Sequence, residues 1–364
     1  MSPARRPILD GVRARCLSFH AAYRCRHAGE CCRAGWDVEV EPHIVEAVTA
    51  GRILPVISTT MPFERLTEGT GFAPARTSSG ECAFHHNDRC SLQQCGSEAM
   101  LPSACRHFPR VFLRDARGLL LTLSHFCPTA ASLLFETRAV DVVEVPATLM
   151  VAEPIEGLDA RDALPPLVRP GLLADSAGYE AWEQAVVRTF LETGDADHAL
   201  SRTESATERV RAWRPTDGPL AQAVEKAFRN APGRTQCPSL STAFDLVREL
   251  TGPHPLMDVP PTFIDDWERV RAIASDALRQ PAARYLAASA FGNWIAYRGQ
   301  GFRSIVAWLR ACHDVLRLQL VRYVRDRQTV SAADLVEPIR MADYIMIHTV
   351  DSLAFGRAAA ALER

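Results

Sequence analysis

The chain has 364 residues, of which 47% are hydrophobic and 23% charged, and its formal net charge is −2. This is the composition of a globular protein, long enough for about two domains and a large buried core. A charge this close to zero argues against the strongly basic surface of a nucleic-acid-binding domain, so we expect no nucleic-acid partner.

No segment of the sequence predicts a membrane-spanning helix or a secretory signal. The uncharged stretch 285–297 has thirteen residues, whereas a helix that crosses a bilayer needs about 20. The N-terminal residues include arginines but no continuous apolar stretch of the kind that a signal peptide needs. We therefore expect a cytoplasmic protein with reduced thiols and no membrane partner.

Cysteines and histidines are concentrated in the N-terminal third. Residues 16–127 contain nine of the eleven cysteines and seven of the eleven histidines. In a reducing compartment, cysteines that cluster in this way more often bind metal than form disulfides. The candidate metal ligands are Cys25, Cys31, Cys32, Cys82, Cys90, Cys105 and Cys127, with Cys95 as a reserve ligand.

Two predicted β-hairpins would gather distant cysteines at one end. The segment 81–92 has a polar turn at Asn87-Asp88, and the segment 110–124 has two apolar runs around a turn at Gly118. Such runs on either side of a short polar turn are typical of paired antiparallel strands. Cysteines that flank these segments would therefore lie close together.

The remaining cysteines and the histidines have a simpler interpretation. We interpret Cys237 and Cys312 as structural thiols, since a free cysteine packs like a small hydrophobic residue, and leave Cys16 unassigned. Five histidines are alternative ligands, but we favour polar surface or loop positions for them because enough thiolates are present. These five are His27, His85, His86, His107 and His125.

The short motifs of this region resemble a bacterial family of cysteine-cluster proteins described as zinc- or iron-chelating. The match covers residues 20–135 and begins with Tyr23-Arg-Cys25 and Cys31-Cys32-Arg-Ala-Gly-Trp36. The motifs that follow in the family order are Cys82-Ala-Phe84, Cys90-Ser-Leu92, Gly96-Ser-Glu98, Leu101-Pro102, Cys105-Arg-His-Phe-Pro-Arg110 and Leu123-Ser-His-Phe-Cys127-Pro128. The Gly-x-Glu, Cys-Arg-x-Phe-Pro-Arg and Cys-Pro elements are most similar to the flagellin lysine-N-methylase branch.

The sequence departs from the family pattern at two places. The first motif usually has a further cysteine near the position where Ala28 stands, and the last usually has serine directly before Cys-Pro, whereas His125-Phe126 intervene here. His27 and Cys95 are the candidates to replace the missing ligand. The other possibility is a metal held by fewer thiolates.

The resemblance and the thiol-rich ligand set imply either an iron–sulfur cluster or zinc. Four cysteines complete a structural zinc site, and a [4Fe–4S] cluster also takes four. The adjacent pair Cys31-Cys32 matches the usual spacing of neither. We favour iron–sulfur, partly from the resemblance, and keep zinc as the alternative.

The rest of the chain reads as a linker followed by helices. Five prolines between Val143 and Gly171 predict an inter-domain linker, and helical periodicity of apolar residues dominates beyond it. We therefore predict a mainly α protein. Its parts are a small cysteine-rich α+β metal-binding domain with short β-hairpins over 1–142, a proline-rich linker over 143–171 and an α-helical bundle domain over 172–364.

Individual helices are predicted from apolar periodicity and from caps. Their ranges are 42–50, 179–192, 220–230, 261–278, 282–297 and 302–327, with breaks at Pro281 and at 299–301. Ser331 and Asp334 match a capping box that starts the last helical region, and Pro338 is expected to kink or end that helix. We interpret the aromatic residues of these helices as core rather than as a ligand-binding site; they are Trp267, Trp294, Phe302 and Trp308.

The last helical region would place Tyr344, His348 and Asp351 on one face. A histidine and an aspartate three residues apart can act as a general acid–base pair. We favour the simpler interpretation of a polar helix face or an inter-domain contact.

Two function classes stay open. The resemblance implies an enzyme that transfers a methyl group from S-adenosylmethionine to lysine on flagellin or another lysine-bearing protein. Its target ammonium must first lose a proton, and Asp37, Glu39 and Glu41 are candidate acidic groups for that pocket. The second class is a non-catalytic zinc- or iron-binding or redox protein. The chain has a single lysine, Lys226, against forty arginines, and no Gly-x-Gly-x-x-Gly cofactor fingerprint.

Overall fold

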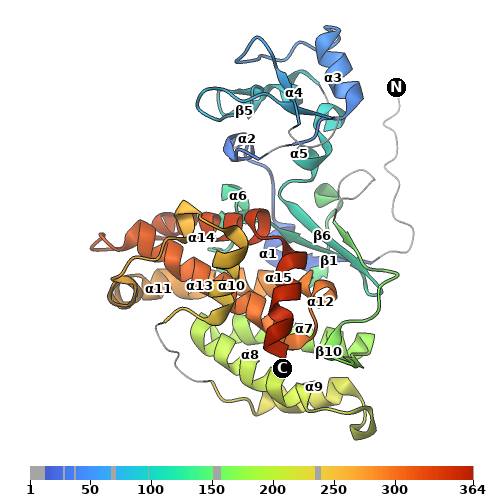
Figure 1. Cartoon of the computed structure of the whole chain (residues 1–364), viewed down its shortest axis with the longest axis vertical. Helices are drawn as coiled ribbons and strands as arrows, with labels where there is room; N and C mark the ends of the chain where they lie inside the picture. Colours follow the sequence, from blue (N-terminus) through green and yellow to red (C-terminus); the bar gives the residue numbers. More distant parts are fainter. Residues whose placement is uncertain are drawn as a thin grey trace.

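The computed structural model describes residues 13–27, 29–36, 38–66, 71–96, 98–150, 157–233 and 239–363. Within these ranges the protein is mainly α with a small mixed sheet, as the sequence predicts. Figure 1 shows a small lobe at one end of the molecule and a larger helical body at the other, with the sheet beside the helical body.

The central sheet has five strands in the order β8-β1-β7-β6-β9. Its strands are β1 (Ala14–Leu17), β6 (Arg110–Asp115), β7 (Gly118–Leu123), β8 (Val142–Glu144) and β9 (Leu158–Asp159). The hairpin predicted over 110–124 is confirmed by the antiparallel register from Arg110↔Leu123 to Asp115↔Gly118. Gly118 has φ +115°, and a Cβ there would lie 2.3 Å from the Arg13 carbonyl oxygen, so the turn requires glycine.

The small lobe consists of short elements around a small core of its own. Its elements are α2 (Glu30–Arg33), α3 (Pro42–Thr49), β2 (Phe63–Arg65), β3 (Phe72–Pro74), β4 (His85–His86), β5 (Arg89–Cys90), α4 (Ser91–Cys95), η1 (Glu98–Met100) and α5 (Ser103–His107). The turn predicted at Asn87-Asp88 joins β4 to β5, and both turn residues have positive φ. The core of the lobe is formed by Val40, Ile44, Phe63, Phe84, Leu92 and Leu101.

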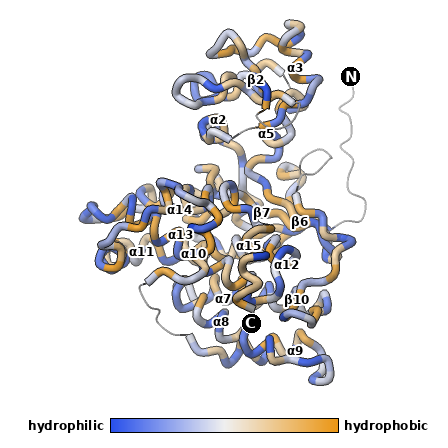
Figure 2. The backbone as a smooth tube through the Cα atoms, viewed as in Figure 1, coloured by the Kyte–Doolittle hydropathy of each residue, from blue (hydrophilic) through white to orange (hydrophobic). Residues whose placement is uncertain are grey.

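The helical body packs around α13 (Phe302–Val324), which is buried along most of its length. The longer helices around it are α7 (Ser176–Thr193), α8 (Ala196–Arg211), α9 (Leu220–Arg229), α10 (Thr242–Thr251), α11 (Phe263–Ala290) and α14 (Ala332–Asp343). Shorter elements are α1 (Ser18–Ala21), α6 (Pro128–Leu133), η2 (Ala147–Leu149), β10 (Leu167–Arg169), β11 (Leu172–Leu173), η3 (Pro215–Asp217), η4 (Pro255–Met257), α12 (Ile295–Arg298), η5 (Tyr344–Thr349), α15 (Ser352–Ala358) and η6 (Ala359–Glu363). Figure 2 shows apolar residues inside this body and hydrophilic segments at its periphery.

The predicted helix break at Pro281 is wrong, because α11 continues through it. Pro338 does not end its helix either, since α14 continues through it, while a kink at Pro338 stays a prediction. A proline inside a helix costs about 3 kcal/mol, but apolar side chains on both sides of Pro281 are buried, among them Leu278 and Leu286. Each buried large apolar side chain stabilises the fold by about 1.5–3 kcal/mol, so packing outweighs the lost hydrogen bond. The capping box at Ser331 and Asp334 is confirmed.

The described part of the chain has two hydrophobic cores, and the boundary between them does not coincide with the linker predicted over 143–171. The sheet residues share one continuous core with the helical body, whereas the small lobe has its separate core. Strands β8 and β9 lie within or beside the stretch expected as a linker, and both pair in the sheet. The independent folding of parts divided at 142 and 171 stays a prediction.

Across the described ranges, no helix is long and apolar enough to cross a bilayer. The aromatic residues Trp267, Phe302 and Trp308 are buried in the large core, as expected, and Trp294 packs against it. Trp294 and Trp308 differ from the expectation in one respect, since both also line a cavity.

Candidate metal centre and adjoining cavity

Seven of the eight candidate ligands line one cavity of about 230 Å³. They come from the segment before α2, from α2 itself, from the β4–β5 hairpin, from α5 and from the start of α6; they are Cys25, Cys31, Cys32, Cys82, Cys90, Cys105 and Cys127. The eighth, Cys95, is exposed at the end of α4 and does not line this cavity. Residues that span more than 100 positions of the sequence therefore meet at one place.

Four of these thiols form a hydrogen-bonded group centred on Cys32. The Cys32 side chain shares hydrogen bonds with Cys31, Cys82 and Cys90. These hydrogen bonds lower the pKa of Cys90 to about 6 and also lower the pKa of Cys31 and Cys82, while the pKa of Cys32 itself is raised. Burial raises the pKa of the nearby Cys105. The group therefore combines thiols that ionise readily with thiols that resist ionisation.

Cys25 and Cys127 form a second part of the cavity wall together with Tyr23. The Tyr23 hydroxyl lies 3.8 Å from the Cys127 sulfur. Cys25 is exposed, and its sulfur lies 3.9 Å from Nδ1 of His27, which also lines the cavity. His27 is thus placed where it could stand in for the family cysteine missing near Ala28; Ala28 itself lies outside the described residues.

The cysteines are gathered but not arranged around an open coordination point. In the described part of the chain, no three or more His, Cys, Asp or Glu side chains converge as a ready-made metal site. Cys32 interacts with Cys31, Cys82 and Cys90, so these thiols are partners of one another. Thiolate metal centres need deprotonated ligands, so metal binding would replace these hydrogen bonds with metal–sulfur bonds.

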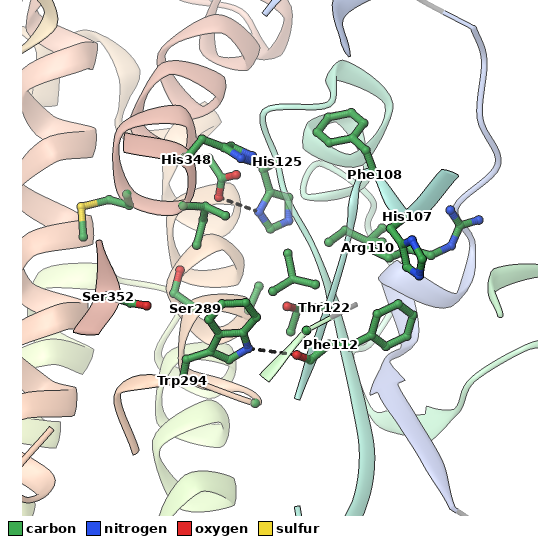
Figure 3. A pocket seen from close by; sticks show the side chains of 18 of the residues that line it. His107, Phe108, Arg110, Phe112, Thr122, His125, Ser289, Trp294, His348 and Ser352 are labelled. Carbon is green, nitrogen blue, oxygen red and sulfur yellow. Dashed lines mark hydrogen bonds and ion pairs between the residues drawn. The ribbon is translucent and has the colours of Figure 1, made fainter. Parts of the chain in front are cut away.

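A second cavity of about 340 Å³ adjoins the first, because Cys31, Val38, Cys105, Phe108 and Arg110 line both. Its wall is rich in aromatic and apolar side chains from the cysteine region, the sheet, the end of α11 and the C-terminal helices. Figure 3 shows His125 and His348 together at one end of this cavity and Trp294 with Phe112 at the other. A volume of this size suits a small organic ligand.

The polar end of the second cavity is a hydrogen-bonded group from two distant parts of the chain. The Asp343 carboxylate accepts hydrogen bonds from the Ser124 hydroxyl (2.7 Å) and from the Phe126 N–H (3.1 Å). Ser124 also lies 2.8 Å from Nε2 of His348. Asp343 is 3.6 Å from Nδ1 of His125. Ser124 and Asp343 are buried, whereas His348 is exposed to the cavity that it lines.

The other candidate histidines, Glu39 and Glu41 do not line the cysteine cavity. His85 is buried 3.2 Å from Glu81, His86 is exposed, and His107 and His125 line the second cavity. Among the acidic candidates, Glu39 and Glu41 line neither of the two cavities, and Asp37 lies outside the described residues. Cys16 and Cys312 are buried, with their pKa raised by burial, while Cys237 is outside the described residues.

His348 and Asp351, considered above as an acid–base pair, each bond to a different partner. Asp351 caps α15 by accepting hydrogen bonds from the N–H groups of Leu353 and Ala354, and His348 bonds to Ser124. His348 lies in the π-helical segment η5, a feature often found at functional sites. No local sequence signal links His348 with Ser124, because 224 positions separate them.

Comparison with known proteins finds no match to this chain among protein-family models, curated proteins or solved structures. The resemblance to the cysteine-cluster family therefore depends on the motifs in residues 20–135 alone.

Proposed function

We propose that this protein binds a metal centre, an iron–sulfur cluster or zinc, through the cysteines of the first cavity. The single observation that carries this proposal is that Cys25, Cys31, Cys32, Cys82, Cys90, Cys105 and Cys127 line one cavity. Thiolate ligands suit both kinds of centre. A bound centre would hold together a lobe whose own hydrophobic core is small.

We further propose that the protein transfers a methyl group from S-adenosylmethionine to lysine on a partner protein, with flagellin as the first candidate. The resemblance to the flagellin lysine-N-methylase branch supplies this reaction. The second cavity supports the proposal because it lies directly beside the cysteines and has room for a small organic ligand.

A non-catalytic metal-carrying or redox function is the alternative. Its specific support is the exposure of Cys25, since exposure at the cavity wall would let a partner exchange metal or electrons with the centre. A wild-type protein that has a reversible redox centre but transfers no methyl group would favour this alternative.

The experiment that tests the metal centre starts from protein purified without oxygen, with measurement of iron, zinc and acid-labile sulfide. We expect stoichiometric metal in the wild type and a large loss in Cys31→Ser. Cys95→Ser is the matched control, because Cys95 belongs to the same lobe but lies outside the cavity. Equal metal content in Cys31→Ser and the wild type would contradict the ligand set.

Methyl transfer is tested with the metal-replete protein, labelled S-adenosylmethionine and flagellin from the same cell. Methyl-lysine located by mass spectrometry, and missing in Cys31→Ser, would support the enzyme. If the metal-replete protein neither binds the cofactor nor labels flagellin, the methyl-transfer part of the proposal fails and the metal centre is judged by metal analysis alone.

A further inference from the structure

The hydrogen bonds at the polar end of the second cavity define the protonation of His348. A carboxylate only accepts hydrogen bonds, so the single hydroxyl proton of Ser124 is donated to Asp343, 2.7 Å away. The Ser124 oxygen can then only accept from Nε2 of His348 at 2.8 Å, so that nitrogen carries the ring proton. In the neutral ring this leaves Nδ1 as the basic nitrogen.

Nδ1 of His348 is available to a molecule in the cavity. Within the described residues it has no hydrogen-bond partner, and His348 lines the cavity, where one side of the ring is packed and part of its surface stays accessible. The ring centroid of Trp36 lies 4.5 Å from that of His348. Desolvation by the surrounding groups lowers the pKa of His348, so the ring is neutral at neutral pH and able to accept a proton.

We infer that His348 is the general base of this cavity, taking a proton from a substrate amine at Nδ1, and that Ser124 and Asp343 are positioning residues that hold its Nε2–H tautomer. The inference deepens the proposed methyl transfer and rests on it for the identity of the amine. It assigns the base to the C-terminal segment rather than to the acidic residues that follow the cysteine pair.

In the proposed step a proton moves from the substrate ammonium to Nδ1 of His348. An N–H bond of the bound ammonium breaks, its electron pair stays on nitrogen, and the proton bonds to Nδ1, which makes His348 an imidazolium. The buried Asp343 carboxylate then balances this charge through Ser124. The amine lone pair can now form a carbon–nitrogen bond with the methyl group, while the carbon–sulfur bond of S-adenosylmethionine breaks and its electron pair remains on sulfur.

The surroundings of the cavity favour transfer in this direction. Apolar walls disfavour a buried ammonium and so lower the pKa of the amine. The carboxylate near His348 favours the imidazolium over the neutral ring. The other ionisable groups that line the cavity are His125, His107, Arg110, Cys31 and Cys105.

Two measurements test the inference. Nitrogen-15 NMR of the histidine-labelled holoprotein, with the His348 signals assigned by their absence in His348→Gln, should show a proton on Nε2 and none on Nδ1. Ser124→Ala and Asp343→Asn should shift this ring towards a mixture of tautomers. A wild-type ring protonated on Nδ1 would overturn the assignment whether or not the protein transfers methyl groups.

The second measurement is the rate of methyl-lysine formation on flagellin. His348→Gln should lower kcat by about 10²–10⁴-fold with little change in KM, and added imidazole should restore part of the rate of His348→Ala. His43→Gln is the control, because His43 is exposed on α3 and lines neither cavity. If the wild type and His348→Gln are equally active, His348 is not the general base, and the proposed methyl transfer is unaffected. If the wild type is inactive, methyl transfer is contradicted, and the NMR result on the tautomer decides the role of His348.

Discussion

Glu30 and Arg340 join the cysteine lobe to the helical body through an ion pair in which Oε2 lies 2.8 Å from Nη2. Glu30 begins α2, the helix that carries two of the clustered cysteines, and Arg340 lies near the end of α14. Nε of Arg340 also donates to the Phe126 carbonyl at 2.9 Å, one residue before Cys127. A single buried guanidinium thus connects α14 to two segments that carry clustered cysteines, at Glu30 and at Phe126.

We expect Arg340→Met to lower the free energy of unfolding by about 2–3 kcal/mol, since it leaves the buried Phe126 carbonyl without its charged donor and removes one of the two arginines that pair with Glu30, the other being Arg33. Glu30→Gln should cost less, about 0.5–1 kcal/mol, because Glu30 is more exposed and its amide replacement can still hydrogen-bond. Urea-induced unfolding of the wild type and both variants measures these differences. An Arg340→Met protein as stable as the wild type would show that this connection contributes little.

The gathering of the cysteines was the part of the candidate site that could be predicted from the sequence. Cysteines cluster in the N-terminal third of the sequence, and the fold brings Cys31, Cys82 and Cys90 together around Cys32. The turn at Asn87 and Asp88 could also be predicted, because both residues adopt a positive φ, which asparagine and aspartate tolerate better than most residues. Both are local signals that depend little on the rest of the chain.

The second cavity could not be predicted in the same way. Ser124 and Asp343 are separated by 219 positions, and each is an ordinary polar residue in its own segment. Their relationship depends on how α14 packs against the end of β7, which is a property of the whole core. The helix through Pro281 was missed for a similar reason, since burial rather than local propensity decides it.

The turn between β6 and β7 gives a second test of the fold. Gly118→Ala places a Cβ 2.3 Å from a backbone oxygen at φ +115°, so we expect a loss of more than about 2 kcal/mol in the free energy of unfolding. Gly171→Ala is the matched control. Gly171 also has positive φ, +79°, but its Cβ would meet no atom within 4 Å, so its loss should be about 1 kcal/mol. If urea unfolding shows the same loss of free energy for Gly118→Ala and Gly171→Ala, the contact between the new Cβ and the Arg13 carbonyl oxygen does not destabilise the fold.

Stability should fall in acid because of the buried His313. Burial, together with Arg317 and Arg310, lowers its pKa from 6.5 to about 3. The unfolded chain therefore binds a proton that the folded protein excludes between pH 6.5 and 3, and the stability present above pH 6.5 is lost as pH falls through this window. From pH 7 to pH 5 we expect this residue to remove about 2 kcal/mol.

The measurement is urea unfolding of the wild type and of His313→Gln at both pH values. The variant should lose less stability between pH 7 and pH 5, whatever its absolute stability. His43→Gln, changed at an exposed position, should keep the pH dependence of the wild type. A His313→Gln protein with an unchanged pH dependence would indicate that this ring is protonated in the fold.

Removal of the proposed metal centre should open the small lobe before the helical body. The lobe has its own small hydrophobic core, formed by six buried residues, whereas the sheet and the helices share one large core. Metal affinity in such a lobe contributes directly to its folding free energy. After chelation we expect trypsin to cleave first at exposed arginines of the lobe, Arg52, Arg65 and Arg89, at rates at least about 10-fold above those of the metal-replete protein. Mass spectrometry of the fragments gives the order of cleavage. Early cuts within α7–α9 at the same rate as in the lobe would show that the metal-free protein loosens as a single unit.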